Sequence, residues 1–268
     1  MRPKALVLQA HGTNRDLDVM NALTLAGADA IGVPLNQLRI QKRLLRDFQL
    51  LVLPGGFSYA DALGAGKLLA VDLNTYFMEE ITAFVAAGKP VIGICNGFQA
   101  LIKSGILPGN PSSLTPLPIF GEGDGGEGAT LTFNQRGHFE CRWVTMKSVS
   151  ETCIWTKGLS EAITCPVAHG EGNFQVGSEY RISNIEQHIA LTYIHPNGSS
   201  ANGEYPFNPN GSFLDIAGIC NHQGNVLGLM PHPENHIFSY QHPRHTRGET
   251  GQSGLTLFQN GVNYGKQM

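Results

Sequence analysis

The feature that most constrains the fold is an alternation of short apolar runs with helix-like stretches over the first hundred residues. Apolar runs typical of strands cover residues 4–9, 30–34, 50–53 and 91–95, and a helical pattern covers residues 16–26. Between residues 53 and 91, apolar side chains recur every three or four positions from Leu69 to Val85, and Gly88 follows as a helix stop. Because alternating strands and helices form right-handed βαβ units, this part of the chain predicts a parallel sheet.

The second half of the chain does not continue this alternation of strands and helices. Residues 108–128 contain four prolines and then a glycine-rich run over residues 121–128, which predicts a loop. Strand-like runs follow at residues 130–147, 189–194, 216–220 and 226–230, and a final helix is expected over residues 254–262. The 268 residues therefore predict one α/β domain: a doubly wound, mostly parallel sheet with helices on both faces and a loop and strand insertion at about residues 108–150.

Composition and charge exclude several classes of protein. The formal net charge is −3 and no run of Lys or Arg occurs, so the chain offers no basic surface for nucleic acid. Its apolar runs are far shorter than the roughly 18–20 residues that a membrane-spanning helix needs, and no secretory signal is evident, so we expect a cytoplasmic protein without a membrane partner. The five cysteines form no C-x-x-C pair, which argues against a disulfide framework or a zinc ribbon.

The segment around Cys95 indicates a nucleophile. An apolar strand ends at this cysteine and an amphipathic helix begins at once, so the thiol lies at the carboxyl end of a parallel sheet beside a helix N-terminus. Gly93 and Gly97 lie two residues to either side, as in the G-x-S-x-G nucleophile elbow. The alternative is a buried structural cysteine, and the paired glycines favour the elbow.

The loop at residues 53–59 also follows a strand and contains two consecutive glycines, Gly55 and Gly56. Such glycines let backbone N–H groups converge on one point, which suits an oxyanion hole. Taken alone, the loop is better explained as a simple turn at a strand end.

His232 is the best candidate for a base. It follows an apolar run, stands between Pro231 and Pro233, and precedes Glu234 by two residues, so that the carboxylate can orient the imidazole. A surface histidine in a proline-rich turn is the alternative. A metal site is a further hypothesis, because His232, His236, His242 and His245 lie within fourteen residues. The intervening prolines and the lack of a nearby cysteine argue against a metal.

Four ordered motifs resemble those of class I glutamine amidotransferases, and among these the glutaminase subunits of phosphoribosylformylglycinamidine synthases. The resemblance runs from about residue 5 to residue 262. The motifs are Pro-Gly-Gly-Phe-Ser-Tyr at 54–59, Gly-Ile-Cys-Asn-Gly-Phe-Gln at 93–99, Pro-Val-Ala-His-Gly-Glu-Gly at 166–172 and Met-Pro-His-Pro-Glu at 230–234.

The resemblance implies a mechanism for L-glutamine hydrolysis. Cys95 would attack the side-chain amide, and His232, oriented by Glu234, would pass a proton to the departing ammonia. The backbone amides of Gly56 and Asn96 would stabilise the oxyanion, and water would hydrolyse the thioester. Further residues of the motifs would line the glutamine pocket: Gly55, Phe57, Gln99, His169 and Glu171. For His169 and Glu171, the equal alternative is that they shape a loop toward a partner subunit.

The resemblance also implies partners. Ammonia would pass to a separate synthetase subunit, which would hold ATP and magnesium and convert formylglycinamide ribonucleotide to its amidine, with a small accessory subunit in the same complex. No cofactor or metal is expected on this chain. A stand-alone cysteine hydrolase or peptidase of the same fold is the alternative.

Two places depart from many stand-alone family members, which have arginine there. Asn235 follows the His-Pro-Glu sequence, and residues 63–66 read Leu-Gly-Ala-Gly. The second feature, together with residues 205–211, resembles the amidotransferase domain of the long single-chain enzyme, so the docking mode stays open.

Overall fold

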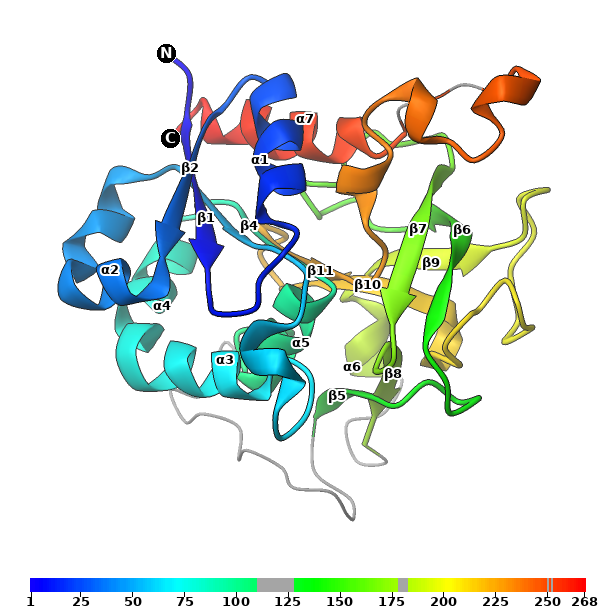
Figure 1. Ribbon diagram of the computed structural model, residues 1–268, viewed down its shortest axis with the longest axis horizontal. Helices are drawn as coiled ribbons and strands as arrows, with labels where there is room; N and C mark the ends of the chain where they lie inside the picture. Colours follow the sequence, from blue (N-terminus) through cyan, green and yellow to red (C-terminus); the bar gives the residue numbers. More distant parts are fainter. Residues whose placement is uncertain (110–127, 178–182, 250, 252) are drawn as a thin grey trace.

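The computed structural model describes residues 1–109, 128–177, 183–249, 251 and 253–268. Its main sheet has nine strands in the order β2-β1-β3-β4-β11-β10-β9-β6-β7 (Figure 1). The bounds of these strands are β1 Lys4–Gln9, β2 Asp29–Pro34, β3 Leu50–Leu53, β4 Val91–Ile94, β6 Glu140–Ser148, β7 Ile163–His169, β9 Ile189–Ile194, β10 Ile216–Cys220 and β11 Val226–Leu229.

The strands of the main sheet run mostly in one direction. Strands β2, β1, β3, β4 and β11 pair in parallel, and each following strand pairs antiparallel with its neighbour. Of these nine strands, β10 and β6 alone therefore run against the rest. The central strands β3, β4 and β11 are buried along their whole length, as expected where helices cover both faces of a sheet.

Helices cover both faces of the parallel half. Helices α1 (Asp16–Leu25) and α7 (Leu255–Gly265) lie side by side on one face, whereas α3 (Lys67–Asp72) and α5 (Asn96–Lys103) pack together on the other (Figure 1). Strand β2 lies on one side of β1 and β3 on the other, so the chain reverses its direction of winding at β1. The predicted α/β class with a doubly wound, mostly parallel sheet is confirmed.

Two predicted elements are each divided in the structure. The stripe from Leu69 to Val85 forms α3, a π-helical segment Leu73–Phe77 and α4 (Met78–Ala86) rather than one continuous α-helix. The run at residues 130–147 is interrupted by a turn that contains Gly137 with a φ of 69°. Its first part, β5 (Ala129–Thr132), pairs with β8 (Asn173–Val176) in a separate two-stranded sheet, and its second part becomes β6.

The remaining α-helices of the described residues are α2 (Leu35–Ile40) and α6 (Ser183–Glu186). Residues 110–127 of the predicted insertion lie outside the described residues, as does most of the glycine-rich run at 121–128, whereas its remainder up to about residue 150 contains β5 and β6. In the part of the chain that the structure describes, no helix has the length and apolar character to cross a membrane.

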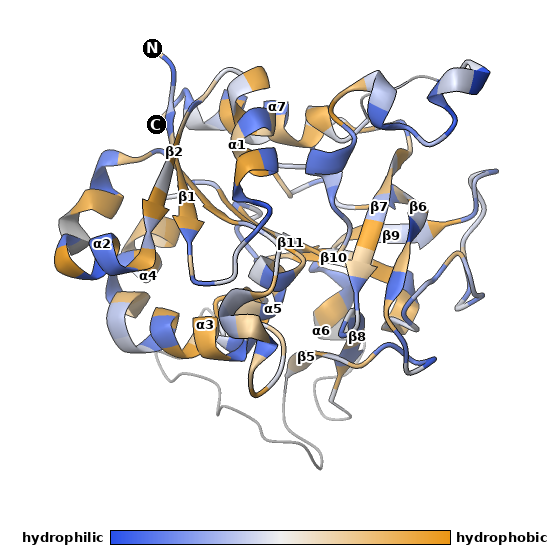
Figure 2. Ribbon diagram, in the orientation of Figure 1, coloured by the Kyte–Doolittle hydropathy of each residue, from blue (hydrophilic) through white to orange (hydrophobic). Residues whose placement is uncertain are grey.

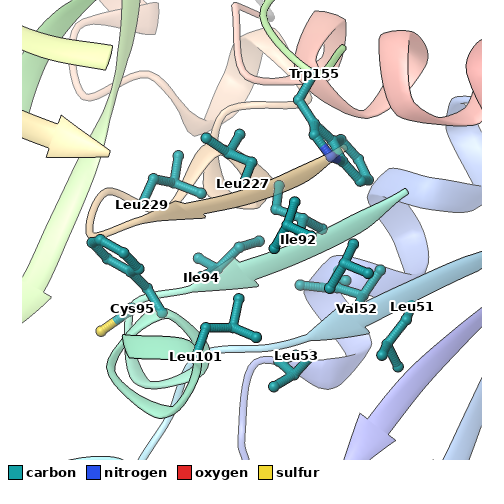
Figure 3. Close-up of a cluster of buried hydrophobic side chains, with 14 of the residues drawn as sticks. Leu51, Val52, Leu53, Ile92, Ile94, Cys95, Leu101, Trp155, Leu227 and Leu229 are labelled. Atoms are coloured by element: carbon teal, nitrogen blue, oxygen red, sulfur yellow. The ribbon is translucent and has the colours of Figure 1, made fainter. Parts of the chain in front are cut away.

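The buried side chains of the central strands form a hydrophobic core, which holds the carboxyl ends of these strands in place. The strands are coloured as apolar along their length, whereas many helices show a polar side (Figure 2). In Figure 3, Trp155 lies at one end of a buried cluster that includes Ile92 and Leu227, and Cys95 lies at the other end with its sulfur directed away from Leu101. The thiol is thus held on a rigid base of close-packed aliphatic side chains.

Candidate active site

The predicted catalytic residues follow neighbouring strands. Gly55 and Gly56 lie just beyond β3, Cys95 directly follows β4, and His232 lies three residues beyond β11. Because β3, β4 and β11 are adjacent and parallel, their carboxyl ends meet at one edge of the sheet. The structure therefore brings together three motifs that are far apart in the sequence.

Cys95 occupies the elbow that its flanking glycines predict. Its φ of 50° lies in the region that side chains other than glycine rarely adopt, and it separates β4 from α5. A Cβ atom on Gly97 would lie 2.0 Å from the Leu53 carbonyl oxygen, and one on Gly93 would lie 2.8 Å from the Gly97 carbonyl oxygen. Both glycines are required because backbone atoms, which cannot move aside, pack against them.

His232 and Glu234 form a buried pair. His232 Nδ1 lies 2.6 Å from Glu234 Oε1, and the histidine is 3% exposed and the glutamate 0%. The carboxylate oxygen accepts a hydrogen bond from the Nδ1–H group, which leaves Nε2 for chemistry. Among the described residues, Nε2 has no partner at full hydrogen-bond geometry. The backbone N–H of His232 donates to the Pro166 carbonyl oxygen at 2.8 Å, so β7 holds the loop in place.

The electrostatics of this pair favour the imidazolium. Burial by itself disfavours the charged ring, but the Glu234 carboxylate and the Cys95 sulfur outweigh burial and raise the pKa of His232 to about 10. The sulfur of Cys95 is thus close enough for its charge to act on the ring. A protonated His232 beside a thiolate is the state from which a cysteine nucleophile attacks.

Gly55 lies between the base and the nucleophile. A Cβ atom there would be 2.7 Å from His232 Cε1 and 3.4 Å from Cys95 Cβ. Gly56 has a φ of +130°, and its Cβ would be 2.7 Å from the Asn14 nitrogen. Neither position has room for a side chain, and the role of the glycine pair in an oxyanion hole stays a prediction.

Phe57 differs from its two glycine neighbours. Its backbone N–H donates to the Gly12 carbonyl oxygen at 3.1 Å, and its side chain is 45% exposed. Its backbone amide is therefore bonded to the loop after β1, and the predicted contact of Phe57 with glutamine would be made by its ring.

Asn96 and Gln99 lie on the first turn of α5, and both are buried. Asn96 Oδ1 accepts from the Ser58 hydroxyl, and its Nδ2 donates to Asp61 at 2.9 Å and to Gln99 Oε1 at 3.2 Å. These side chains brace the loop after β3. The backbone N–H of Asn96 belongs to the first turn of the helix, where such donors have no partner within the helix.

Glu171 clamps that same loop from the other side. Both of its carboxylate oxygens accept from the Ala65 N–H at 3.2 Å, and Lys103 Nζ lies 3.5 Å from Oε2. Lys103 also donates to the Ala65 carbonyl oxygen at 2.5 Å, while Gln99 Nε2 donates to the Glu171 carbonyl oxygen at 2.7 Å. The Glu171 side chain is thus occupied with protein contacts and shapes the loop.

The clamped loop has an unusual backbone. Tyr59, Ala60, Asp61 and Leu63 all have φ values between 52° and 64°. Each such residue carries a cost on the order of 1–2 kcal/mol, so the loop needs the contacts of Glu171 and Lys103 to hold its shape. Burial, followed by the nearby charge of Glu171, raises the pKa of Asp61.

His169 is the remaining predicted pocket residue. It is buried at the end of β7, and Asn134 Oδ1 lies 3.1 Å from its Nδ1. A Cβ atom on Gly172 would lie 2.4 Å from His169 Cε1, so the glycine lets the following turn fold onto the ring. Burial, with a smaller contribution from the charge of His232, lowers the pKa of His169 to about 3.

The histidines considered for a metal site do not assemble into one. His232 pairs with Glu234, and His236 Nδ1 contacts the Thr164 carbonyl oxygen. The His242 ring is tilted by 39° relative to the His236 ring, with ring centroids 5.5 Å apart. Within the described ranges, no group of three or more His, Cys, Asp or Glu side chains could hold a metal ion.

Three residues of the site carried no signal in the sequence. Asn134, Asp61 and Lys103 contact the predicted motifs, but each stands alone without a flanking pattern. Their partners are at least 35 positions away in the chain, so local spacing could not have revealed them.

Comparisons with known proteins show the family to which the chain belongs. A family model described as the CobB/CobQ-like glutamine amidotransferase domain matches residues 2–265. The chain belongs to this family of glutamine amidotransferases.

Relatives within the family are close. The protein named phosphoribosylformylglycinamidine synthase subunit PurQ from Treponema denticola is 52% identical, with 98% of this chain and 99% of the relative covered. The protein of the same name from Dehalococcoides mccartyi is 39% identical over 99% of this chain and 98% of its own length.

A solved structure resembles the whole chain. A chain in the structure of PurLQS from Thermotoga maritima superposes with a TM-score of 0.72 at 31% identity, covering 98% of this chain and 99% of that chain. This glutamine amidotransferase therefore shares its fold over nearly its full length with a protein solved as part of a multi-subunit assembly.

Proposed function

We propose that this chain is the glutaminase subunit of a phosphoribosylformylglycinamidine synthase and supplies ammonia for purine biosynthesis. The observation that carries the proposal is the buried His232–Glu234 pair beside the Cys95 elbow, at the ends of adjacent parallel strands. The names of relatives that match along their whole length specify the synthase.

The proposed reaction proceeds through a thioester. The Cys95 thiolate attacks the side-chain carbonyl carbon of L-glutamine, and the oxyanion that forms accepts from the backbone amides of Gly56 and Asn96. The carbon–nitrogen bond then breaks, and His232 gives its proton to the leaving nitrogen, which departs as ammonia. Water, deprotonated by His232, hydrolyses the thioester and releases glutamate. Glu234 keeps the imidazole oriented throughout.

The ammonia is used by a partner. We infer a synthetase subunit that binds ATP and magnesium, together with a small accessory subunit, because the similar Thermotoga maritima chain was solved as part of PurLQS. This chain itself would need no cofactor and would act in the cytoplasm. Its complex converts formylglycinamide ribonucleotide to formylglycinamidine ribonucleotide.

The test is Cys95→Ala in the complex reconstituted with the synthetase and accessory subunits of the same organism. We expect glutamine-dependent amidine formation to fall by at least about a thousandfold, since the nucleophile is gone, while synthesis from added ammonia is retained. Cys141→Ala, at an exposed cysteine, is the matched control and should retain both activities. Loss of both activities in Cys95→Ala, or of neither, would contradict the proposal.

A further inference from the structure

Asn134 uses all of its polar groups to hold the turn after β7. Its side-chain Nδ2 donates to the carbonyl oxygens of His169 at 2.8 Å and His138 at 2.9 Å, and its Oδ1 accepts from the Gly172 N–H at 2.9 Å. Its backbone N–H donates to the Gly170 carbonyl oxygen at 2.9 Å. Two carbonyl oxygens need the amide nitrogen and one N–H needs the amide oxygen, so this network fixes which way the Asn134 amide points.

This orientation determines where the proton of His169 lies. Asn134 Oδ1 is also 3.1 Å from His169 Nδ1, and a carbonyl oxygen can only accept. His169 Nδ1 must therefore carry a hydrogen. Because burial keeps the pKa of this ring at about 3, the ring is neutral near neutral pH and holds a single proton. His169 Nε2 is thus a bare lone pair.

That lone pair is buried without a donor. The residue is 3% exposed, and Nε2 has no hydrogen-bond partner among the residues that the structure describes. Buried polar atoms of native proteins are nearly always satisfied, so an orphan of this kind requires an explanation. An N–H group of a ligand would satisfy it.

The backbone on both sides of His169 contacts the nucleophile's helix. The Ala168 carbonyl oxygen lies 3.7 Å from Cys95 Sγ, and the Glu171 carbonyl oxygen accepts from Gln99. The charge of His232 also acts on the His169 ring. The His169 ring is therefore within electrostatic range of His232, the residue that would give its proton to the leaving nitrogen, and its flanking backbone contacts Cys95 and Gln99.

We propose that Asn134 is a positioning residue that fixes the Nδ1–H tautomer of His169, so that His169 Nε2 accepts a hydrogen bond from the carboxamide nitrogen of glutamine and then from departing ammonia. The inference rests on the proposed glutaminase function. In the acylation step the Cys95 sulfur–carbon bond forms, the carbon–nitrogen bond breaks, and the proton comes from His232. His169 gains and loses no proton, so it holds the product as neutral ammonia, the form that can act as a nucleophile.

The tautomer is tested without any assay of activity. The chain is labelled with ¹⁵N-histidine, and the His169 signals are assigned by their loss in His169→Phe. We expect a protonated Nδ1 and a bare Nε2 with no titration from about pH 6 to pH 8. In Asn134→Ala the tautomer should shift or average. A proton on Nε2 in the unaltered chain would overturn the proposal, whatever the protein's function.

The role in catalysis is tested by acylation of Cys95, measured by acid quench and mass spectrometry of the glutamyl thioester. We expect kcat/KM for this step to fall about tenfold to a hundredfold in Asn134→Ala and in His169→Phe, as for one lost buried hydrogen bond. The double variant should fall no further, because both changes remove the same interaction. Multiplicative losses, or an unchanged kcat/KM, would overturn the proposal.

Asn225→Ala is the matched control. Asn225 is equally buried and donates to the Val85 and Lys89 carbonyl oxygens at 2.9 and 3.0 Å, but it lies just before β11, at the opposite end of that strand from His232. Its loss should lower stability while leaving the His169 tautomer and acylation unchanged. The rate of Cys95 alkylation by iodoacetate should stay within about twofold in every variant if the elbow is intact.

The two measurements can give different answers. If the unaltered chain shows the expected His169 tautomer but Cys95 forms no glutamyl thioester, the result counts against the glutaminase function and against the acceptor role that rests on it. It would leave the action of Asn134 on His169 established.

Discussion

At the scale of single residues, the chemistry depends on charges that the fold removes from water. His232 and Glu234 are both almost fully buried, yet each has the other as a partner, so neither is left as an isolated charge. His169, a second buried histidine nearby, has an amide rather than a carboxylate as its partner and stays neutral. The identity of the neighbour therefore separates the proton donor from the neutral acceptor.

Glu234→Gln tests the electrostatic role of the pair. Because the pKa of His232 is raised from 6.5 to about 10, its charged form stabilises the fold fully below about pH 6.5, and this contribution is lost as pH rises toward 10. Removing the carboxylate should lower the free energy of unfolding by about 3 kcal/mol at pH 7 and flatten its decline between about pH 7 and pH 9. Urea unfolding at a series of pH values measures both effects.

Glu204→Gln serves as the control, since Glu204 pairs with His195 at 3.5 Å but is 63% exposed on its side chain. Its effect should be less than about 1 kcal/mol. An identical pH dependence in Glu234→Gln and the unaltered chain would show that the carboxylate does not hold the charge of His232.

At the scale of elements, the site is built from turns that leave no room for a side chain. Gly97 lets α5 begin against the Leu53 carbonyl oxygen, and Gly55 lets the loop after β3 lie against the His232 ring. The order of strands brings these turns together, and the loop at residues 59–65, strained over residues 59–63, is held by contacts from α5 and from the turn after β7. At both glycines, the start of α5 and the loop after β3 can pack this closely only because no side chain is present.

Gly97→Ala should be strongly destabilising for this reason. The new Cβ atom would lie 2.0 Å from a backbone oxygen, so either β3 or α5 must move, at a cost of about 2–3 kcal/mol. Gly170→Ala is the matched control, because its Cβ would meet only Phe139 Cδ2, at 3.8 Å, and it should change stability by less than about 0.5 kcal/mol. Chemical denaturation of both variants measures the difference, and equal stabilities would refute the steric argument.

At the scale of the whole molecule, the parallel and antiparallel halves share one continuous sheet. Trp155, in the segment between β6 and β7, donates its indole N–H to the Asn225 carbonyl oxygen at 3.2 Å. A Cβ atom on Gly261 of α7 would lie 2.0 Å from its ring. This tryptophan therefore joins the second half of the chain to a helix that covers the first. Such shared burial favours unfolding as one cooperative unit.

The two tryptophans allow that expectation to be measured. Trp143 lies on β6, against the rings of His236 and His242, so Trp143→Phe and Trp155→Phe each leave one reporter in a different part of the fold. In each variant, the fluorescence transition in urea should coincide with the transition seen by far-ultraviolet circular dichroism. Midpoints that differ within one variant by more than about 0.5 M would indicate two separately folding units, contrary to the single domain predicted from the sequence.

Much of the fold and the catalytic centre could be predicted because their signals are local. The strand ending at Cys95, its flanking glycines and the His232-Pro-Glu234 sequence each lie within a few residues, and spacing alone constrains what so short a segment can form. The division of the Leu69 to Val85 stripe was not predictable, because apolar periodicity persists through the π-helical segment at 73–77.

The sequence by itself determined the class of fold, and it was enough to single out Cys95, His232 and Glu234 as the proposed nucleophile, base and orienting carboxylate, since each of these signals lies in neighbouring residues. Only the tertiary structure decided how the pocket is held. Asn134 meets His169 across 35 positions, and Ala65 meets Glu171 across 106. The physical reason is that these contacts form only after separate strands and turns have packed together at one edge of the sheet. A pattern of neighbouring residues carries no information about which distant residues will be in contact.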